Sequence, residues 1–304
     1  MKKLLTYHIT ETPISQTVEQ FLKSQGYSKH LLIRLKHSPL GLSIGGVKVF
    51  SNHLLKTVEV LEVRLDEPED SPNIVATPMD LNIVYEDEDL LVLNKPAALP
   101  IHPSQGHYDT TLANGMAWYF RQKNEPFVYR AINRLDRDTT GLLILARHSL
   151  SAAILSQMVK EHQIHREYLA VASGLLDFEG AIRAPIARAA DSTIMRQVDF
   201  KRGDPACTHY RLLHYNPELD CSLAALTLET GRTHQIRVHF KHIGHPLLGD
   251  FLYHPDYRLI ARQSLHSHKL SFRHPLSQKE LVLEAPLPED MKFVFSHERR
   301  NPLG

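Results

Sequence analysis

The chain has 304 residues, 42% hydrophobic and 23% charged, a composition typical of a globular protein with one large domain or two unequal ones. Its 35 lysines and arginines nearly balance its 34 acidic residues, so any polyanion would have to bind a local basic surface. The two cysteines, Cys207 and Cys221, exclude a disulfide framework and are expected to be buried thiols. Without a His-Glu-x-x-His motif or a compact His/Cys cluster, we expect no bound metal.

The sequence shows no pattern typical of a signal peptide or of a membrane-spanning helix. The apolar run at the N-terminus ends at Leu5, which is too short for the core of a signal peptide. No later window has about 18 uninterrupted apolar residues, the length a membrane-spanning helix needs. We therefore expect a cytoplasmic protein that does not enter a membrane.

Residues 1–66 are predicted to form a small α/β module. Val18, Phe21 and Leu22 repeat at helical spacing, and Gly26 is the expected stop of this first helix. The stretch "SKHLLIRLKHS" repeats the pattern, and the strand-like run that follows includes Val58 and Val60. The expected order is helix, helix, short strands. An acidic, proline-containing segment, residues 67–80, is the predicted linker to a large domain at 81–304.

The large domain mixes strands and helices. Two strands are expected in "IVYEDEDLLVLNKP", followed by a buried strand at "GLLILA" and a helix over "SLSAAILSQMVKEHQI" with serines as N-caps. Strands at "EYLAVASG" and "SLAALTLETG" precede a helix in "RTHQIRVHFKHIGHP" that Gly244 ends. Because strands and helices do not alternate regularly, we predict an α+β fold with a mixed, largely antiparallel sheet and flanking helices.

Two polar stretches stand at the ends of buried elements. In "NRLDRDTTGLLILAR", Asp136 precedes an apolar strand that would hold a catalytic carboxylate rigidly. Spacing alone favours a simpler role, in which Asp136 or Asp138 caps a turn.

The second stretch, "ETGRTHQIRVH", places Arg232, His234 and Arg237 at a helix N-terminus, where anions bind favourably. Arg237 adjoins the apolar face and would need a carboxylate partner, which Asp136 would supply. The alternative is that these arginines are solvated charges on the helix surface.

Four motifs together resemble the RluA-type pseudouridine synthases. They are "NRLDRDTTGLLILAR", "HREYLAVASG", "TLETGRTHQIRVHFKHIGHPLLGDFLY" and "SLHSHKLSFRHP", and "YEDEDLLVLNKPAALPIHPS" is similar to the opening strand pair of that family. The resemblance covers residues 82 to 288 and implies the pseudouridine synthase fold, with a catalytic cleft, an RNA substrate and no cofactor. The N-terminal module resembles a degenerate form of a small ribosomal-protein-type RNA-binding domain.

The resemblance also implies roles for single residues. Asp136 matches the essential aspartate of the family, Tyr168 its active-site tyrosine, and Arg237 the arginine that pairs with the aspartate. Arg134 matches an arginine that occupies the space of a displaced base. We expect Arg134, Arg232 and His234 to contact RNA. The chain departs from the usual motifs at three positions, where the family has His, Ser and Lys: Asn133, Thr140 and Arg166.

The resulting expectation is a monomeric enzyme that converts specific uridines to pseudouridine in ribosomal RNA, with large-subunit RNA as the first choice. The same chemistry on transfer RNA is one alternative. Another is a noncatalytic RNA-binding or ribosome-assembly protein on this fold, which replacement of Asp136, Tyr168 or Arg237 would have favoured. A carbohydrate hydrolase would need a second carboxylate about 5 to 9 Å from the first, and no motif supplies one.

Overall fold

The computed structural model describes residues 2–10, 16–67, 71 and 73–296. Its helices and strands are, in chain order, β1 (Lys2–His8), α1 (Val18–Ser24), α2 (Lys29–His37), β2 (Leu42–Ile44), β3 (Val47–Lys48), β4 (Val60–Asp66), β5 (Ile83–Glu86), β6 (Leu90–Lys95), α3 (Leu112–Gln122), β7 (Thr140–Ala146), α4 (Ser149–Lys160), β8 (His165–Ser173), β9 (Glu179–Arg183), β10 (Ile186–Arg188), β11 (Arg196–Val198), β12 (Cys207–Asn216), β13 (Cys221–Leu228), α5 (Gln235–His242), β14 (Leu265–Arg273), β15 (Glu280–Glu284) and the 3₁₀ helix η1 (Glu289–Phe295).

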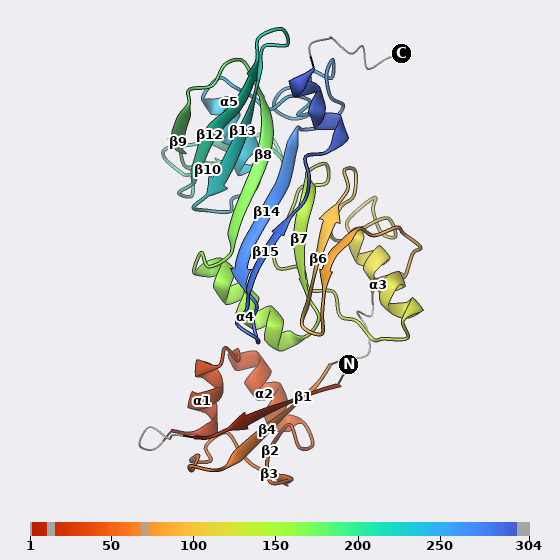
Figure 1. The fold of residues 1–304 in the computed structure, drawn as a ribbon, viewed down its shortest axis with the longest axis vertical. Helices are drawn as coiled ribbons and strands as arrows, with labels where there is room; N and C mark the ends of the chain where they lie inside the picture. Colours follow the sequence, from red (N-terminus) through yellow and green to blue (C-terminus); the bar gives the residue numbers. More distant parts are fainter. Residues whose placement is uncertain (1, 11–15, 68–70, 72, 297–304) are drawn as a thin grey trace.

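A nine-stranded sheet forms the centre of the large domain (Figure 1). Its strand order is β5-β6-β7-β14-β8-β13-β12-β9, and β15 pairs with β14 beside this path. Strands β7 and β14 run parallel, whereas the other pairs in this sheet are antiparallel. The predicted α+β class with a largely antiparallel sheet is confirmed.

Helices cover both faces of the large sheet. Alternating residues of β6 separate the two cores, because successive side chains of a strand point to opposite faces. Leu91 and Leu93 pack in the core that also contains residues of α3 and α5. Leu90 and Val92 pack in the core that contains α4 residues. Tyr168 belongs to the first of these cores, so it lies on the face that α5 covers.

The N-terminal module has its own four-stranded sheet, in the order β1-β4-β2-β3, with α1 and α2 packed on it. The predicted order of helix, helix and short strands missed β1, which pairs with β4 along its whole length. In β1 exposed and half-buried residues alternate, so only one face is covered and no apolar run marks the strand. Val58 is also not in a strand; it has φ +69° and is exposed.

The predicted helices are present, but the N-cap residue of α4 differs from the prediction. Gly26 and Gly244 follow α1 and α5 in the left-handed region, with φ of +86° and +85°. The N-cap of α4 is His148 and not a serine, since its Nδ1 accepts the backbone N–H of Ser151 at 3.2 Å. The imidazole ring thus replaces the serine hydroxyl expected from the sequence.

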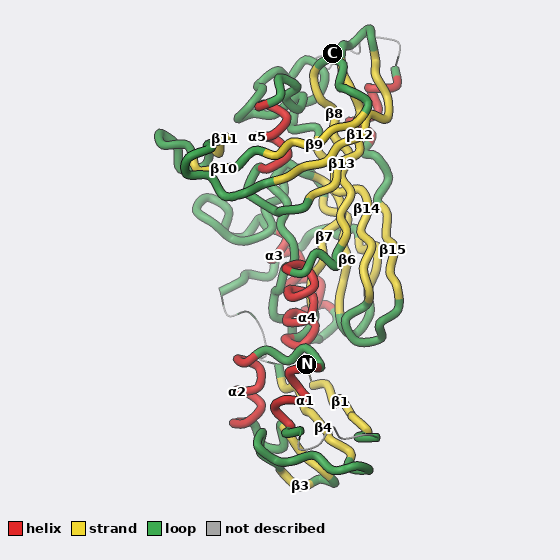
Figure 2. The backbone as a smooth tube through the Cα atoms, turned by 90° about the vertical axis from the view of Figure 1, so that its left-hand side faces the viewer, coloured by secondary structure: helices red, strands yellow, loops and turns green. Residues whose placement is uncertain are grey.

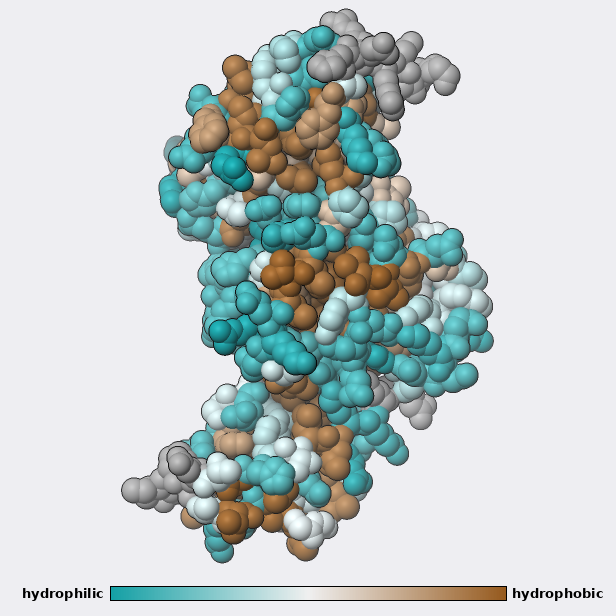
Figure 3. Space-filling model, in the orientation of Figure 1, coloured by the Kyte–Doolittle hydropathy of each residue, from teal (hydrophilic) through white to brown (hydrophobic). Residues whose placement is uncertain are grey.

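The module meets the large domain beside α4 (Figure 2). Leu150 of α4 completes the apolar core of the module, and the molecule narrows at this level, where hydrophobic and hydrophilic residues lie side by side (Figure 3). Glu67, the first residue of the predicted linker, accepts hydrogen bonds from the backbone and side chain of Ser149 at 2.9 and 2.6 Å and from Arg34 at 3.1 Å. It also pairs with Arg130. Residues 68–70 and 72 of that linker lie outside the described residues.

Candidate active site

Asp136 lies in the loop immediately before β7. Its carbonyl accepts the N–H of Thr139 at 3.1 Å, which closes a turn at the start of the strand. The ammonium group of Lys95 lies beneath this loop and donates to three carbonyls, including that of Arg137 at 2.7 Å. Lys95 is buried, and this burial lowers the pKa of its ammonium group to about 7. These hydrogen bonds hold the loop in place, and the side chain of Asp136 remains 29% exposed.

Arg237, on the first turn of α5, binds two carboxylates. Its side chain is 1% exposed, and its Nη1 donates to Oδ2 of Asp136 at 2.8 Å. Its Nε and Nη2 donate to the two oxygens of Asp250 at 2.7 and 2.8 Å. Rings of Phe251 and Tyr253 lie 5.3 and 5.1 Å from the guanidinium carbon. Because the fork of an arginine is planar, the pair with Asp250 fixes where Nη1 points.

The charges around Arg237 keep it protonated. Burial alone would lower the pKa of its guanidinium, but hydrogen bonds and charge from Asp250, with a further contribution from Asp136, outweigh burial and raise it above the ordinary value. His234 lies beside the pair, with its Nε2 3.8 Å from Oδ2 of Asp136. Burial lowers the pKa of His234 and outweighs the opposing charge of Asp136, which favours a neutral ring next to the carboxylate.

A pocket of about 350 Å³ gathers the predicted site residues. Its lining includes Asp136, Tyr168 and Arg237 together with Arg134, Arg232 and His234. Pockets of 300 Å³ and more accommodate small organic groups such as a nucleoside. A larger hollow of about 660 Å³ lies against α3, but it contains none of these residues. The structure therefore brings residues of both polar stretches together at one pocket.

Tyr168, on β8, is one of the residues that line this pocket. The side chain is buried, and burial is the largest cause that raises the pKa of its hydroxyl. The phenol is thus neutral at physiological pH, with its ring part of the apolar core. Tyr168 therefore lines the pocket and also belongs to the apolar core, the two positions that the sequence left open.

The arginines of the site extend beyond the pocket. Arg134 is exposed at its edge. Arg232 lines both the pocket and a neighbouring groove of about 420 Å³, which also contains Arg188, Arg196 and Arg202. Its Nη1 lies 3.6 Å from a carboxylate oxygen of Asp204. Four arginines in one groove provide the local basic surface that the overall charge balance does not indicate.

Comparisons with known proteins identify the family of the chain. A family model described as RNA pseudouridylate synthase matches residues 89–242. A protein of Bacillus subtilis named "Uncharacterized RNA pseudouridine synthase YjbO" is 40% identical over 93% of this chain and 99% of its own length. The chain belongs to the RNA pseudouridine synthase family. The RluA-type resemblance, the fold and the isomerase class expected from the sequence are thereby confirmed.

Two further relatives extend this result. The "Ribosomal large subunit pseudouridine synthase D" of Zymomonas mobilis is 40% identical over 76% of this chain and 74% of that protein. Among solved structures, human RNA pseudouridylate synthase domain containing 1 has a TM-score of 0.58 at 28% identity, covering 68% of this chain and 83% of that one.

Asn133, the residue that departs from the usual histidine of the family, has a structural role. It is buried, its Oδ1 accepts the N–H of Ile144 at 2.8 Å, and its Nδ2 donates to the carbonyl of Leu142 at 3.4 Å. Both ends of the amide therefore bind the backbone of β7. Thr140, a second departure, contacts Nδ1 of His266 at 2.9 Å. Asp138 pairs with Arg137 and does not line the pocket.

Two residues that support the site, Asp250 and Lys95, are not predicted by the sequence patterns. A buried arginine needs at least one carboxylate, and Asp136 alone satisfies this need, so the pattern gives no reason to expect a second partner. Asp250 ends the apolar run "HPLLGD", a position similar to that of a carboxylate fixed by a buried segment. Lys95 gave no signal, because lysine is mostly a surface residue.

Proposed function

We propose that this synthase converts specific uridines of large-subunit ribosomal RNA to pseudouridine, with Asp136 as the reacting carboxylate. The observation that carries the proposal is that Arg237, fixed from behind by buried Asp250, holds the carboxylate of Asp136 in the lining of a nucleoside-sized pocket. The choice of RNA is supported by a relative named for the large ribosomal subunit that is 40% identical to this chain.

The reaction moves uracil from a nitrogen to a carbon linkage on the same ribose. A stacked nucleotide cannot present both its base and its sugar to Asp136, so the uridine must be extruded into the pocket. Arg134, exposed at the edge, is positioned to fill the space that the base leaves or to hold a phosphate.

Asp136 acts in its ionised form. Cleavage of the glycosidic bond develops positive charge on the sugar, which a carboxylate stabilises or traps covalently. Three roles are compatible with its position: addition to the sugar, addition to the base, or removal of a sugar proton. In each, Arg237 orients the carboxylate through one hydrogen bond and leaves the second oxygen for the substrate.

Tyr168 would stack on the extruded uracil. Its neutral hydroxyl would also assist the final removal of a proton from the ring carbon. His234, held at 2.9 Å from the hydroxyl of Tyr253, and Arg232 would contact the RNA backbone at the pocket wall. The arginine groove beyond Arg232 would then carry the neighbouring phosphates. No cofactor enters this scheme.

We further propose that the protein acts as a monomer in the cytoplasm, where ribosomal RNA is modified. Among the described helices, none is long and apolar enough to cross a membrane. Residues 1–66 would form an RNA-binding module and 81–304 the catalytic domain, joined at 67–80.

The direct test maps pseudouridine in ribosomal and transfer RNA from cells with and without the gene. The proposal predicts that at least one large-subunit position loses pseudouridine and regains it when the wild-type gene is restored. Restoration with Asp136→Asn should not return the modification, although the variant accumulates normally. Loss of sites in transfer RNA alone would contradict the choice of RNA, and loss of none would contradict the activity.

A further inference from the structure

A second group of polar side chains lies on the sheet outside the pocket. Cys207 begins β12, and His209 follows two residues later, so both side chains point to the same face. Glu229 follows the last residue of β13 on the adjacent strand, and its N–H donates to the carbonyl of Cys207 at 3.2 Å. Nε2 of His209 lies 3.5 Å from Sγ of Cys207 and 2.6 Å from Oε1 of Glu229. One potential ligand atom from each residue lies within 4.8 Å of the other two.

We propose that Cys207, His209 and Glu229 form a Zn²⁺ site, separate from the pocket of Asp136. Thiolate, imidazole and carboxylate are the donors that zinc uses in proteins. The thiolate disfavours magnesium and calcium, which prefer oxygen ligands only.

The distances agree with a tetrahedral ion. Zinc bonds of about 2.3 Å to sulfur and 2.05 Å to nitrogen place those two atoms about 3.6 Å apart at the tetrahedral angle. The observed sulfur to nitrogen distance is 3.5 Å. The carboxylate oxygen would have to move from 2.6 Å to about 3.3 Å from the imidazole nitrogen. Glu229 is 49% exposed, so its side chain is free to make this small movement.

The surroundings support three protein ligands and one open position. His209 and Glu229 both reach solvent, which leaves room for a water molecule as fourth ligand. Arg183 donates to both oxygens of Glu229, from Nη1 to Oε2 at 3.4 Å and from Nη2 to Oε1 at 3.3 Å, and the contact with Oε2 would remain when Oε1 binds the ion. On binding, the S–H bond of Cys207 breaks, a zinc–sulfur bond forms and the proton passes to solvent, with no change of oxidation state.

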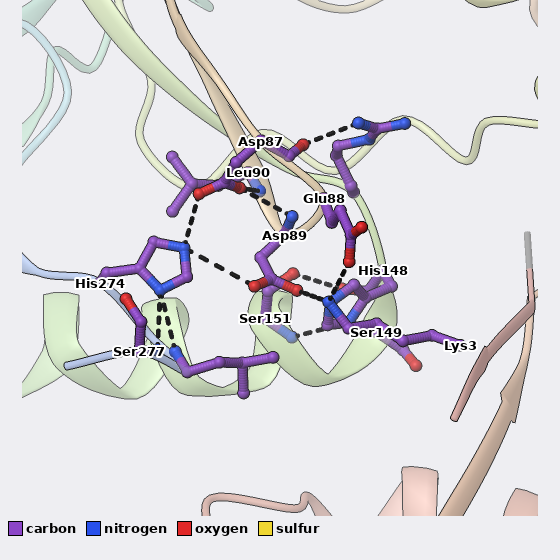
Figure 4. Close-up of polar contacts among 12 residues, drawn as sticks. Lys3, Asp87, Glu88, Asp89, Leu90, His148, Ser149, Ser151, His274 and Ser277 are labelled. Carbon is purple, nitrogen blue, oxygen red and sulfur yellow. Dashed lines mark hydrogen bonds and ion pairs between the residues drawn. The ribbon is translucent and has the colours of Figure 1, made fainter. Parts of the chain in front are cut away.

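A rival group, Asp87, Asp89 and His274, has potential ligand atoms equally close together (Figure 4). Nδ1 of His274 accepts the backbone N–H groups of Leu276 and Ser277 at 3.3 and 3.0 Å, so it carries no proton. A neutral ring then carries its proton on Nε2, which faces Oδ2 of Asp87 at 2.8 Å. That nitrogen has no free lone pair for a metal ion.

Asp89 already has other partners for one of its carboxylate oxygens. Nε2 of His148 lies 2.7 Å from its Oδ1, and Lys3 pairs with the same oxygen. By contrast, Nδ1 of His209 has no hydrogen bond within the described part of the chain, so the ring is free to take the tautomer that zinc requires. The sequence did not indicate the site because Glu229 stands 20 residues from His209 and is brought beside it by strand pairing.

The site is connected to the loop that enters α5. The N–H of Cys207 donates to Oγ1 of Thr230 at 3.1 Å, and Nε2 of Gln235 donates to its carbonyl at 2.9 Å. An ion shared by Cys207 and Glu229 would therefore cross-link β12 to the beginning of the segment that carries Arg232. Zinc should for that reason raise the midpoint of thermal unfolding.

The test uses the full chain, freed of metal with a chelator and titrated with Zn²⁺ or Co²⁺. We expect one equivalent of either ion to bind, and the cobalt form to show a thiolate-to-metal charge-transfer band. Cys207→Ser should remove the band and weaken zinc binding by at least about 100-fold, since even outer-shell changes weaken binding by roughly 10–100-fold. Glu229→Gln, an exposed change with little effect on folding, should weaken it at least about tenfold.

Two matched controls complete the test. Cys221→Ser removes the other buried cysteine and should leave the band and the affinity unchanged. Asp87→Asn removes an acid of the rival group and should also have no effect. The proposal is overturned if the wild-type chain binds no zinc, if Cys207→Ser and Glu229→Gln bind it as the wild type does, or if Asp87→Asn abolishes binding.

Discussion

Arg237 contacts two carboxylates that lie 114 positions apart in the chain, Asp136 and Asp250. A lysine in its place has one compact ammonium group and cannot reproduce the two-oxygen contact with Asp250. We expect Arg237→Lys to reduce the rate of the chemical step about 100-fold, as a displacement of 1 Å at a reacting group can. Single-turnover conversion of uridine measures this rate.

The control for Arg237→Lys is Arg258→Lys, because Arg258 is exposed and pairs with Asp256 away from the pocket. A rate close to wild type in Arg237→Lys would show that the guanidinium does not position Asp136.

Asn133 belongs to the same sequence motif as Asp136, but its role is structural, in contrast to that of Arg237. Removal of its amide leaves the N–H of Ile144 and the carbonyl of Leu142 without this partner. We expect Asn133→Ala to lower the free energy of unfolding by about 1–3 kcal/mol, the cost of unpaired buried polar groups. Denaturant unfolding measures the loss. An unchanged stability together with a large loss of turnover would instead indicate direct participation in the reaction.

At the scale of elements, the junction of the module and α4 depends on Glu67. Burial alone would raise the pKa of this carboxyl, but the hydrogen bonds from Ser149 and the charges of Arg130 and Arg34 outweigh it and lower the pKa to about 2. A depressed carboxyl pKa stabilises the fold above the ordinary value of 4.5, and the contribution is lost as the pH falls toward 2.

Glu67→Gln should therefore reduce the free energy of unfolding by about 3 kcal/mol at neutral pH, because it leaves two half-buried arginines, Arg34 and Arg130, without their carboxylate. The difference between wild type and variant should shrink as the pH falls below 4.5. Glu88→Gln, an exposed residue of the β5–β6 turn, is the control and should show no such pH dependence. A difference that stays constant between neutral pH and pH 4 to 3 would contradict the role of ionised Glu67.

Local patterns predicted most elements and missed others for definable reasons. Helices α1, α2, α4 and α5 follow from apolar residues at helical spacing on one face. Strand β1 was missed because its stability comes from pairing with β4, which is distant in sequence. The cap of α4 was misassigned because the sequence offers several serines, whereas His148 is fixed by its contact with Asp89.

The roles of the site residues also cannot be predicted from local patterns. For Asp136, Tyr168 and Arg237, spacing alone leaves turn capping, a core tyrosine and a surface charge as alternatives, and only the resemblance to the family gives them roles. Asp250 and Lys95 act through contacts that appear only when the chain folds.

At the scale of the whole molecule, RNA binding should depend on the arginine groove. Each phosphate contact that is removed lowers the salt dependence of binding by about one unit of slope. We expect Arg188→Gln with Arg202→Gln to weaken binding of a large-subunit RNA fragment and to reduce the slope of log affinity against log salt by about 2. Arg273→Gln, at the far end of β14, is the control. An unchanged slope would exclude the groove as a path for RNA.

The role of Asp136 as the reacting carboxylate is tested most directly by turnover of a large-subunit RNA fragment by the purified chain and by Asp136→Asn. We expect the wild-type chain to form pseudouridine and Asp136→Asn to be at least about 10⁴-fold slower, as when a reacting group is removed from an enzyme. Asp138→Asn, two residues away and outside the pocket, should keep most of the activity. Turnover by folded Asp136→Asn near the wild-type rate would show that Asp136 is not the reacting carboxylate.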